Sequence, residues 1–82
     1  PGLWDVIFLN DNITSMEFVI RVLKQIFGKN QEQADAITKR IHEEGSGVVG
    51  SYVHEVAEQK GIETTLLARQ ENFPLQVKVK KQ

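Results

Sequence analysis

The residues best suited to binding chemistry in this sequence are Asn10, Asp11 and His42. Asn10 and Asp11 come directly after the apolar run at residues 4–9, and His42 follows the apolar Ile41. An amide oxygen, a carboxylate and a neutral imidazole can each accept a hydrogen bond. Beside apolar side chains, they could hold a group that is cationic at one end and hydrophobic beyond it. Alternatively, Asn10 and Asp11 form a turn, and His42 interacts with the dipole at a helix end.

Catalytic and metal-binding patterns are weak in this sequence. The clusters of possible metal ligands, at residues 42–44 and 54–55, lack the pair of histidines four positions apart that a helical zinc site would show. None of Ser15, Ser46 and Ser51 lies in a GxSxG-like turn. We therefore expect a protein that is not an enzyme and that uses no metal and no cofactor.

Composition narrows the classes of partner. The chain has 82 residues, no cysteine and a net charge of -1, which argues against nucleic acid as the main partner. No apolar run approaches the roughly 18 residues that cross a bilayer, so we expect no membrane association. We expect one domain over residues 1–82, a monomer, in a reducing compartment.

Apolar periodicity and turn residues predict six elements. They are a strand at residues 4–9, a helix from about residue 15 to 28, a helix from residue 30 to 45, a strand at 47–52, a helix at 53–70 and a strand at 75–80. Thr14 with Glu17 predicts a capping box for the first helix, and Asn30 with Gln33 predicts one for the second. Gly28 and Gly45 are the expected helix ends.

The order β-α-α-β-α-β predicts a two-layer α+β fold, with helices on one face of a three-stranded antiparallel sheet. Met16 and Val19 of the first helix would then face Thr38 and Ile41 of the second. The third helix is expected to bury Val56, Ala57, Leu67 and Ala68. Gly61 would mark close packing or a bend in that helix, and Gly50 a bulge in the second strand.

Four segments in order resemble the ClpS family, the adaptors that deliver N-degron substrates to the Clp ATP-dependent protease. Residues 9–19 (LNDNITSMEFV) are close to the family signature LNDDYTPMEFV. The segments IHEEG at 41–45, EVAEQK at 55–60 and ENFPL at 71–75 agree as well. The similarity extends over residues 4–79, and the family's β-α-α-β-α-β fold agrees with the order predicted above.

The resemblance implies a binding module for the free N-terminal residue of other proteins when that residue is Leu, Phe, Tyr or Trp. By position, Asn10, Asp11 and His42 would receive the α-amino group. The pocket for the first side chain would comprise Thr14, Met16, Val19, Thr38, Ile41 and Leu75, with Met16 at the rim rejecting β-branched residues. Glu55 and Lys60 match positions that contact the N-terminal domain of a ClpA/ClpC-type AAA+ unfoldase. The expected location is the bacterial cytoplasm, or an organelle of bacterial origin.

The sequence departs from the family pattern at the pocket. Thr38 replaces an apolar residue, often Met, and Ile41 replaces a usual Val. The family's flexible N-terminal extension takes part in handing over substrate, so we expect delivery to depend on residues before Pro1. Four alternatives remain: a module that docks on the unfoldase without delivering N-degrons, a recognition domain of a ubiquitin-ligase-type protein, an interaction module such as a ribosomal stalk domain, and an unrecognised enzyme.

Overall fold

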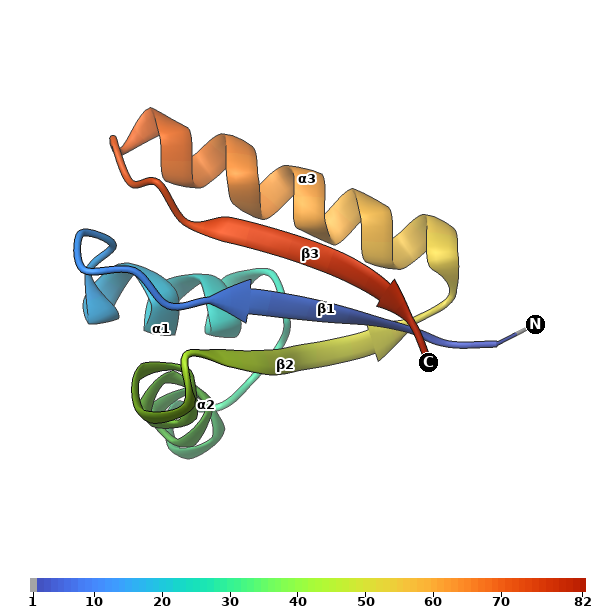
Figure 1. The fold of residues 1–82 in the computed structure, drawn as a ribbon, viewed down its shortest axis with the longest axis horizontal. Helices are drawn as coiled ribbons and strands as arrows, with labels where there is room; N and C mark the ends of the chain where they lie inside the picture. Colours follow the sequence, from blue (N-terminus) through green and yellow to red (C-terminus); the bar gives the residue numbers. More distant parts are fainter. Residues whose placement is uncertain (1) are drawn as a thin grey trace.

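The computed structural model describes residues 2–82 and confirms the predicted order of elements (Figure 1). These are β1 (Trp4–Leu9), α1 (Met16–Gln25), α2 (Gln31–Glu44), β2 (Ser46–Tyr52), α3 (His54–Gln70) and β3 (Gln76–Lys81). The strands form one antiparallel sheet in the order β2-β1-β3, so the first strand of the chain is the central one. The α+β fold class is confirmed.

The sheet contains the predicted bulge. Val6 pairs with Gly50 of β2, but the next residue, Ile7, pairs with Val48, so Val49 is the additional residue. The pairing of β1 with β3 runs without a shift from Trp4–Lys81 to Leu9–Gln76. A bulge increases local twist and bends its strand.

One face of the sheet carries the core. Val6 and Phe8 of β1 are fully buried. Asp5, directly before Val6, accepts hydrogen bonds from Ser51 (2.6 Å) and Gln82 (2.7 Å). Successive side chains of a strand point to opposite faces, so Asp5 lies on the face away from the core. The core continues into α2, α3 and α1, whose buried members are Phe18, Val19, Val22 and Leu23.

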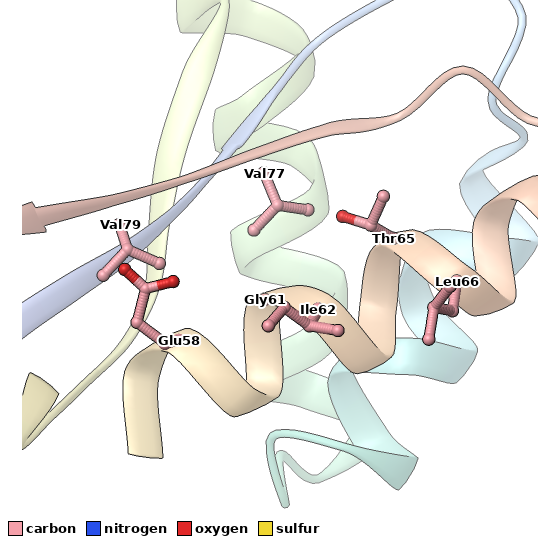
Figure 2. Close-up of a pocket in the computed structure, with 7 residues that line it drawn as sticks. All are labelled: Glu58, Gly61, Ile62, Thr65, Leu66, Val77 and Val79. Carbon is pink, nitrogen blue, oxygen red and sulfur yellow. The ribbon is translucent and has the colours of Figure 1, made fainter. Parts of the chain in front are cut away.

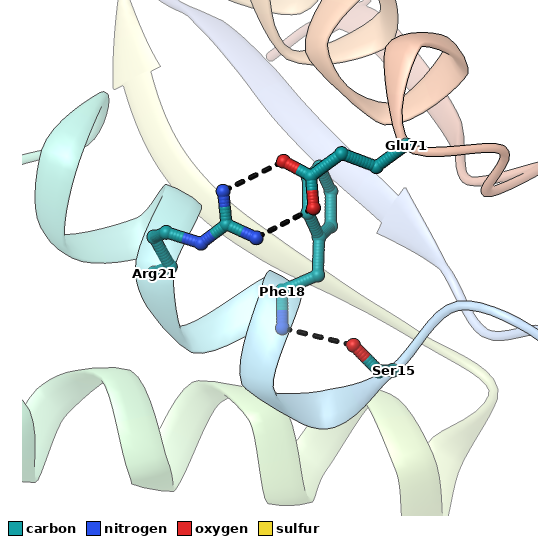
Figure 3. A network of polar contacts seen from close by, with 4 residues as sticks. All are labelled: Ser15, Phe18, Arg21 and Glu71. Atoms are coloured by element: carbon teal, nitrogen blue, oxygen red, sulfur yellow. Dashed lines mark hydrogen bonds and ion pairs between the residues drawn. The ribbon is translucent and has the colours of Figure 1, made fainter.

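The start of α1 corrects one prediction. Ser15, not Thr14, is the N-cap, and its hydroxyl accepts from the Phe18 N–H at 3.1 Å (Figure 3). The Thr14 hydroxyl instead donates to the Asp11 carboxylate at 2.8 Å. The capping box of Asn30 with Gln33 at the start of α2 is confirmed.

The two predicted glycine stops both have left-handed backbone. Gly45 follows α2 with φ 89°, and its N–H donates to Ile41. Gly28 has φ 67°, although α1 itself ends earlier, at Gln25, and a loop bond from Lys29 to Leu23 closes the turn. The turn at Gly28 lets α2 follow α1 after a short loop, and the turn at Gly45 lets β2 follow α2 directly.

The inward face of α3 differs from the prediction at one residue. Ala57 and Ala68 are buried and Leu67 is half-buried as expected, but Val56 is 36% exposed. The buried stripe consists of small residues at helical spacing, Ala57, Gly61, Thr64 and Ala68, and Val56 lies beside it. Gly61 marks close packing, because a Cβ there would lie 3.4 Å from Val79 of β3, and α3 is unbroken around it.

Candidate functional site

One backbone hydrogen bond joins the end of β1 to the end of α2. The Asn10 N–H donates to the Gly45 carbonyl at 2.8 Å. Because Gly45 ends α2, this bond brings Asn10 and Asp11 beside the last turn of the helix, which carries His42. The three residues singled out from the sequence therefore meet at one end of the sheet.

The turn after β1 holds the Asp11 carboxylate in place. Oδ1 accepts from the Ile13 N–H (2.9 Å) and the Thr14 N–H (2.6 Å), and Oδ2 accepts from the Thr14 hydroxyl (2.8 Å). Partial burial acts to raise the pKa of Asp11, but these bonds, first the backbone ones, and the charge of Arg69 outweigh it and lower the pKa below its ordinary value. The carboxylate is thus charged at neutral pH. A carboxylate offers about four acceptor positions, so one remains free on Oδ2.

A cavity of about 240 Å³ opens at this point between the turn, α1 and α2. It is lined by Asn12 and by every residue predicted to bind the N-terminal amine or its side chain except Leu75: Asn10, Asp11, Thr14, Met16, Val19, Thr38, Ile41 and His42. Asn12, which was not among the predicted site residues, also lines this cavity because it follows Asp11 in the turn. The polar acceptors come from the turn and the end of α2, whereas the buried Val19 and Ile41 form an apolar wall.

Leu75 lies in a smaller adjoining hollow of about 20 Å³. Asn10, Asp11, Thr14, Val19 and Ile41 line both spaces, and Phe8, Leu9 and Leu75 complete the smaller one. Leu75 is 2% exposed, so it belongs to the floor beneath the cavity rather than to its open wall. At the opposite extreme, Met16 is 53% exposed and stands at the rim.

Two residues in the wall of the cavity have unusual surroundings: Ile41 is tightly packed, and Thr38 has an unpaired hydroxyl. Ile41 lies against Gly47 of β2, where an added Cβ would approach Ile41 Cγ1 to 2.9 Å. Thr38 is 4% exposed, and its hydroxyl has no hydrogen-bond partner. Buried hydroxyls nearly always have a partner, so Thr38 is an exception that needs an explanation.

An ion pair connects α1 to the turn that leads into β3 (Figure 3). The Arg21 guanidinium donates two hydrogen bonds of 2.7 Å to the two carboxylate oxygens of Glu71. Hydrogen bonding to Arg21 lowers the pKa of Glu71. Arg69 donates to the Phe73 and Leu75 carbonyls in the same turn. These contacts fix Leu75 relative to α1, which carries Met16 and Val19.

Comparison with known proteins gives consistent results. The family model described as ATP-dependent Clp protease adaptor protein ClpS matches residues 1–78. The ClpS adapter of Deinococcus radiodurans is 43% identical over 94% of this chain and 68% of its own length. That of Lawsonia intracellularis is 47% identical over 92% of this chain and 69% of its own length.

The chain belongs to the ClpS family of Clp protease adaptors. ClpS proteins are adaptors and not enzymes, in agreement with the weak catalytic patterns in the sequence. A solved structure of Agrobacterium tumefaciens ClpS2, described as bound to L-phenylalaninamide, has a TM-score of 0.96 and 34% identity. The alignment covers all of this chain and 99% of that one. Family membership makes the protein an adaptor in regulated protein degradation.

The two ClpS positions predicted to contact an unfoldase are placed differently on α3. Glu55 is exposed. Lys60 is half-buried: its ammonium donates to the Ile26 carbonyl at 2.8 Å and lies 5.3 Å from the ring centre of Tyr52. Five helical positions separate the two residues, which is about 140° around the axis, so they do not share one face.

A second hollow of this ClpS protein lies between α3 and β3 (Figure 2). Ile62 and Leu66 of α3 and Val77 and Val79 of β3 supply its apolar walls, and Glu58 stands at the end near Val79. It offers one carboxylate, whereas the cavity at Asp11 combines an amide, a carboxylate and an imidazole. The cavity at Asp11 is therefore better suited to a cationic ligand.

No group of three or more possible metal-ligating side chains comes together within residues 2–82. No helix in this part of the chain is long and apolar enough to cross a membrane.

Proposed function

We propose that this adaptor binds the free N-terminal residue of N-degron substrates when that residue is Leu, Phe, Tyr or Trp, and delivers them to a ClpA/ClpC-type AAA+ unfoldase of the Clp protease. The observation that carries the proposal is the single cavity that joins three hydrogen-bond acceptors to an apolar wall. The phenylalaninamide bound to the related Agrobacterium ClpS2 supports it, since that ligand has a free amine and a large apolar side chain.

The acceptors suit an α-ammonium group. Such a group has a pKa of about 7.7–8 and offers three N–H donors when charged. Asp11 has one free acceptor position and a full negative charge, Asn10 can accept through its amide oxygen, and His42 can accept while its imidazole is neutral. An internal residue would bring a peptide bond to the same place, so only chain ends fit.

The apolar wall suits a large hydrophobic side chain. Burial of a Leu or Phe side chain contributes roughly 1.5–3 kcal/mol, which adds to the charge-assisted hydrogen bonds. Val19 and Ile41 provide this surface, and Leu75 lies beneath it. Met16 at the rim would contact the Cβ of the bound residue and disfavour branching there.

Binding can be tested by fluorescence anisotropy with short peptides that differ only in residue one. We expect Leu, Phe, Tyr and Trp peptides to bind, Ile and Val peptides to bind much more weakly, and an acetylated Phe peptide not to bind. If no peptide binds, N-degron recognition is excluded, and the alternative of a module that docks on the unfoldase without delivering N-degrons takes its place.

For delivery, we propose that Glu55 contacts the N-terminal domain of the unfoldase in the bacterial cytoplasm. Lys60 would take part in the same contact, although one N–H of its ammonium already donates to the Ile26 carbonyl. The test is degradation of a Phe-starting reporter by unfoldase and protease. Glu55→Arg is expected to slow degradation without changing peptide affinity, with Glu63→Arg, exposed elsewhere on α3, as the control. Equal degradation by wild type and Glu55→Arg would exclude this contact.

A further inference from the structure

The unpaired hydroxyl of Thr38 is the least explained feature of the cavity. Thr38 lines it, is 4% exposed, and its Oγ1 has no hydrogen-bond partner. Threonine in a helix usually bonds its hydroxyl to a backbone carbonyl three or four residues earlier. Thr64 of α3 does this, donating to the Lys60 carbonyl at 2.8 Å. The buried hydroxyl of Thr38 therefore has no bond within the protein that a ligand would have to replace.

The other walls offer a ligand side chain little polar contact. Val19 and Ile41 are apolar, and the Met16 thioether is a weak acceptor. The Thr14 hydroxyl already donates to Asp11. Asn10, Asp11 and His42 belong to the end of the cavity that would take the amine. Thr38 is the wall residue whose hydroxyl can both donate to and accept from a bound side chain.

The spacing along α2 indicates where that polar contact lies. Thr38 precedes His42 by four residues, which is about 6 Å along the helix axis. A ligand whose amine sits at His42 would reach Thr38 with a group at the far end of its side chain. The phenol oxygen of tyrosine is at that end, whereas phenylalanine has only a C–H there.

We propose that Thr38 is a specificity-determining residue that makes this adaptor prefer tyrosine to phenylalanine as the first residue of its ligand. The inference rests on the proposed function. In this proposal, rotation about χ1 turns the hydroxyl, which is buried in the free protein, toward the bound ring. The hydroxyl then gains a partner from tyrosine without giving up an existing one, because it has none in the free protein. With phenylalanine the same hydroxyl stays unpaired.

The test compares the affinities of two peptides that begin with Tyr and Phe and are otherwise identical. We expect wild type to bind the Tyr peptide about tenfold more tightly, as one gained hydrogen bond predicts. Thr38→Val keeps the shape and removes the hydroxyl, so the ratio of the Tyr affinity to the Phe affinity should fall from about ten to about one. Thr38→Ser should retain the preference, and Thr64→Val should leave it as in wild type.

The possible outcomes distinguish a failure of N-degron recognition from a failure of the proposed role of Thr38. If wild type binds neither peptide, N-degron recognition itself fails. If it binds both with equal affinity, or if Thr38→Val keeps the tenfold difference, recognition stands and the role of Thr38 is overturned. An equal loss for both peptides in Thr38→Val would also overturn it, because Thr38 would then only shape the wall.

Discussion

Thr38 and Thr64 are both buried threonines in helices, but their hydroxyl groups differ in hydrogen bonding. Thr64 is fully buried in α3, and its hydroxyl donates to the Lys60 carbonyl. Thr38 in α2 is nearly as buried, and its hydroxyl donates to nothing. Hydrogen bonding within the protein makes one of them a structural residue. The absence of such a bond leaves the other available to a ligand.

The same contrast holds for the regions around them. Around Thr64, a stripe of small residues lets α3 approach the sheet closely. A Cβ added at Gly61 would be in ordinary contact with Val77 and Val79, so there is room for a methyl group and little more. Around Thr38, the turn at Asp11 and the last turn of α2 hold a cavity open. Substitutions on the α3 side should therefore change stability, and those on the α2 side should change binding.

The largest effect is expected for His42→Ala. His42 is exposed and lines the cavity, so its loss removes one acceptor of the ammonium and no core contact. A hydrogen bond to a charged group contributes about 1.5–3 kcal/mol, so affinity for a Phe-starting peptide should fall roughly 10- to 100-fold with little change in Tm.

The matched control for His42 is His54→Ala. His54 is also exposed, but it lies on Trp4, with ring centres 4.0 Å apart, away from the cavity. Peptide affinity should match wild type by anisotropy. A similar loss in both variants would mean that His42 acts through something other than contact with the ligand.

Gly47→Ala should disturb both binding and folding. The added Cβ would meet Ile41 Cγ1 at 2.9 Å, so Ile41 must move, and Ile41 forms part of the cavity wall. Overpacking of this kind costs about 1–3 kcal/mol. Urea denaturation should show the loss of stability, and anisotropy a weaker peptide affinity.

The comparison for Gly47 on the α3 side is Gly61→Ala. There the added Cβ makes ordinary contact with Val79 and Val77, at 3.4 and 3.5 Å, and alanine is favoured over glycine in a helix by about 1 kcal/mol. The free energy of unfolding should stay the same or rise. A loss as large as that of Gly47→Ala would show that α3 is packed too tightly to accept a methyl group.

A smaller effect is expected when each threonine becomes valine. Thr64→Val loses the bond to the Lys60 carbonyl and should lower stability by about 1 kcal/mol, or roughly 4–8 °C in Tm. Thr38→Val loses no bond in the free protein, so its Tm should equal or exceed that of wild type. Equal losses of Tm in the two variants would contradict this prediction, because the two hydroxyls would then contribute equally to stability.

The smallest effect concerns Arg21→Met, which removes the ion pair with Glu71. The pKa of Glu71 is lowered in the folded protein, so the unfolded chain binds more protons near that pKa, and the pair stabilises above it and not below. Arg21→Met should therefore lower Tm slightly at about pH 7, and the difference should disappear as the pH falls through the lowered pKa of Glu71. Partial exposure of both side chains keeps the effect small.

Much of the fold follows from local patterns. The strand at Trp4–Leu9 lies where the apolar run predicted it, and the Asn30 cap and the Gly45 stop are where their residue types predicted them. The N-cap of α1 was predicted at Thr14 instead of Ser15 because these adjacent residues are both of a capping type. In the structure the Thr14 hydroxyl bonds to Asp11, and the Ser15 hydroxyl accepts from the helix. The predicted burial of Val56 was wrong because small residues, not the most apolar ones, face the sheet along α3.

The site could be predicted only as a set of residues. Asn10, Asp11 and His42 meet as expected, but the bond from Asn10 to Gly45 that joins them depends on the packing of β1 against the end of α2. That Lys60 turns toward Ile26, 34 residues away, and that Thr38 lacks a partner are properties of the assembled structure. No local pattern encodes either one.

The central place of β1 in the sheet affects how the adaptor is made on the ribosome. Among the three strands β1 is synthesised first, whereas its second neighbour, β3, is synthesised last, and Leu75 comes immediately before β3. One edge of the central strand therefore stays unpaired until residues 76–81 have left the exit tunnel. Until Leu75 and β3 have folded onto β1, a nascent chain lacks the floor of its cavity, and it cannot yet bind a ligand there as the finished domain would.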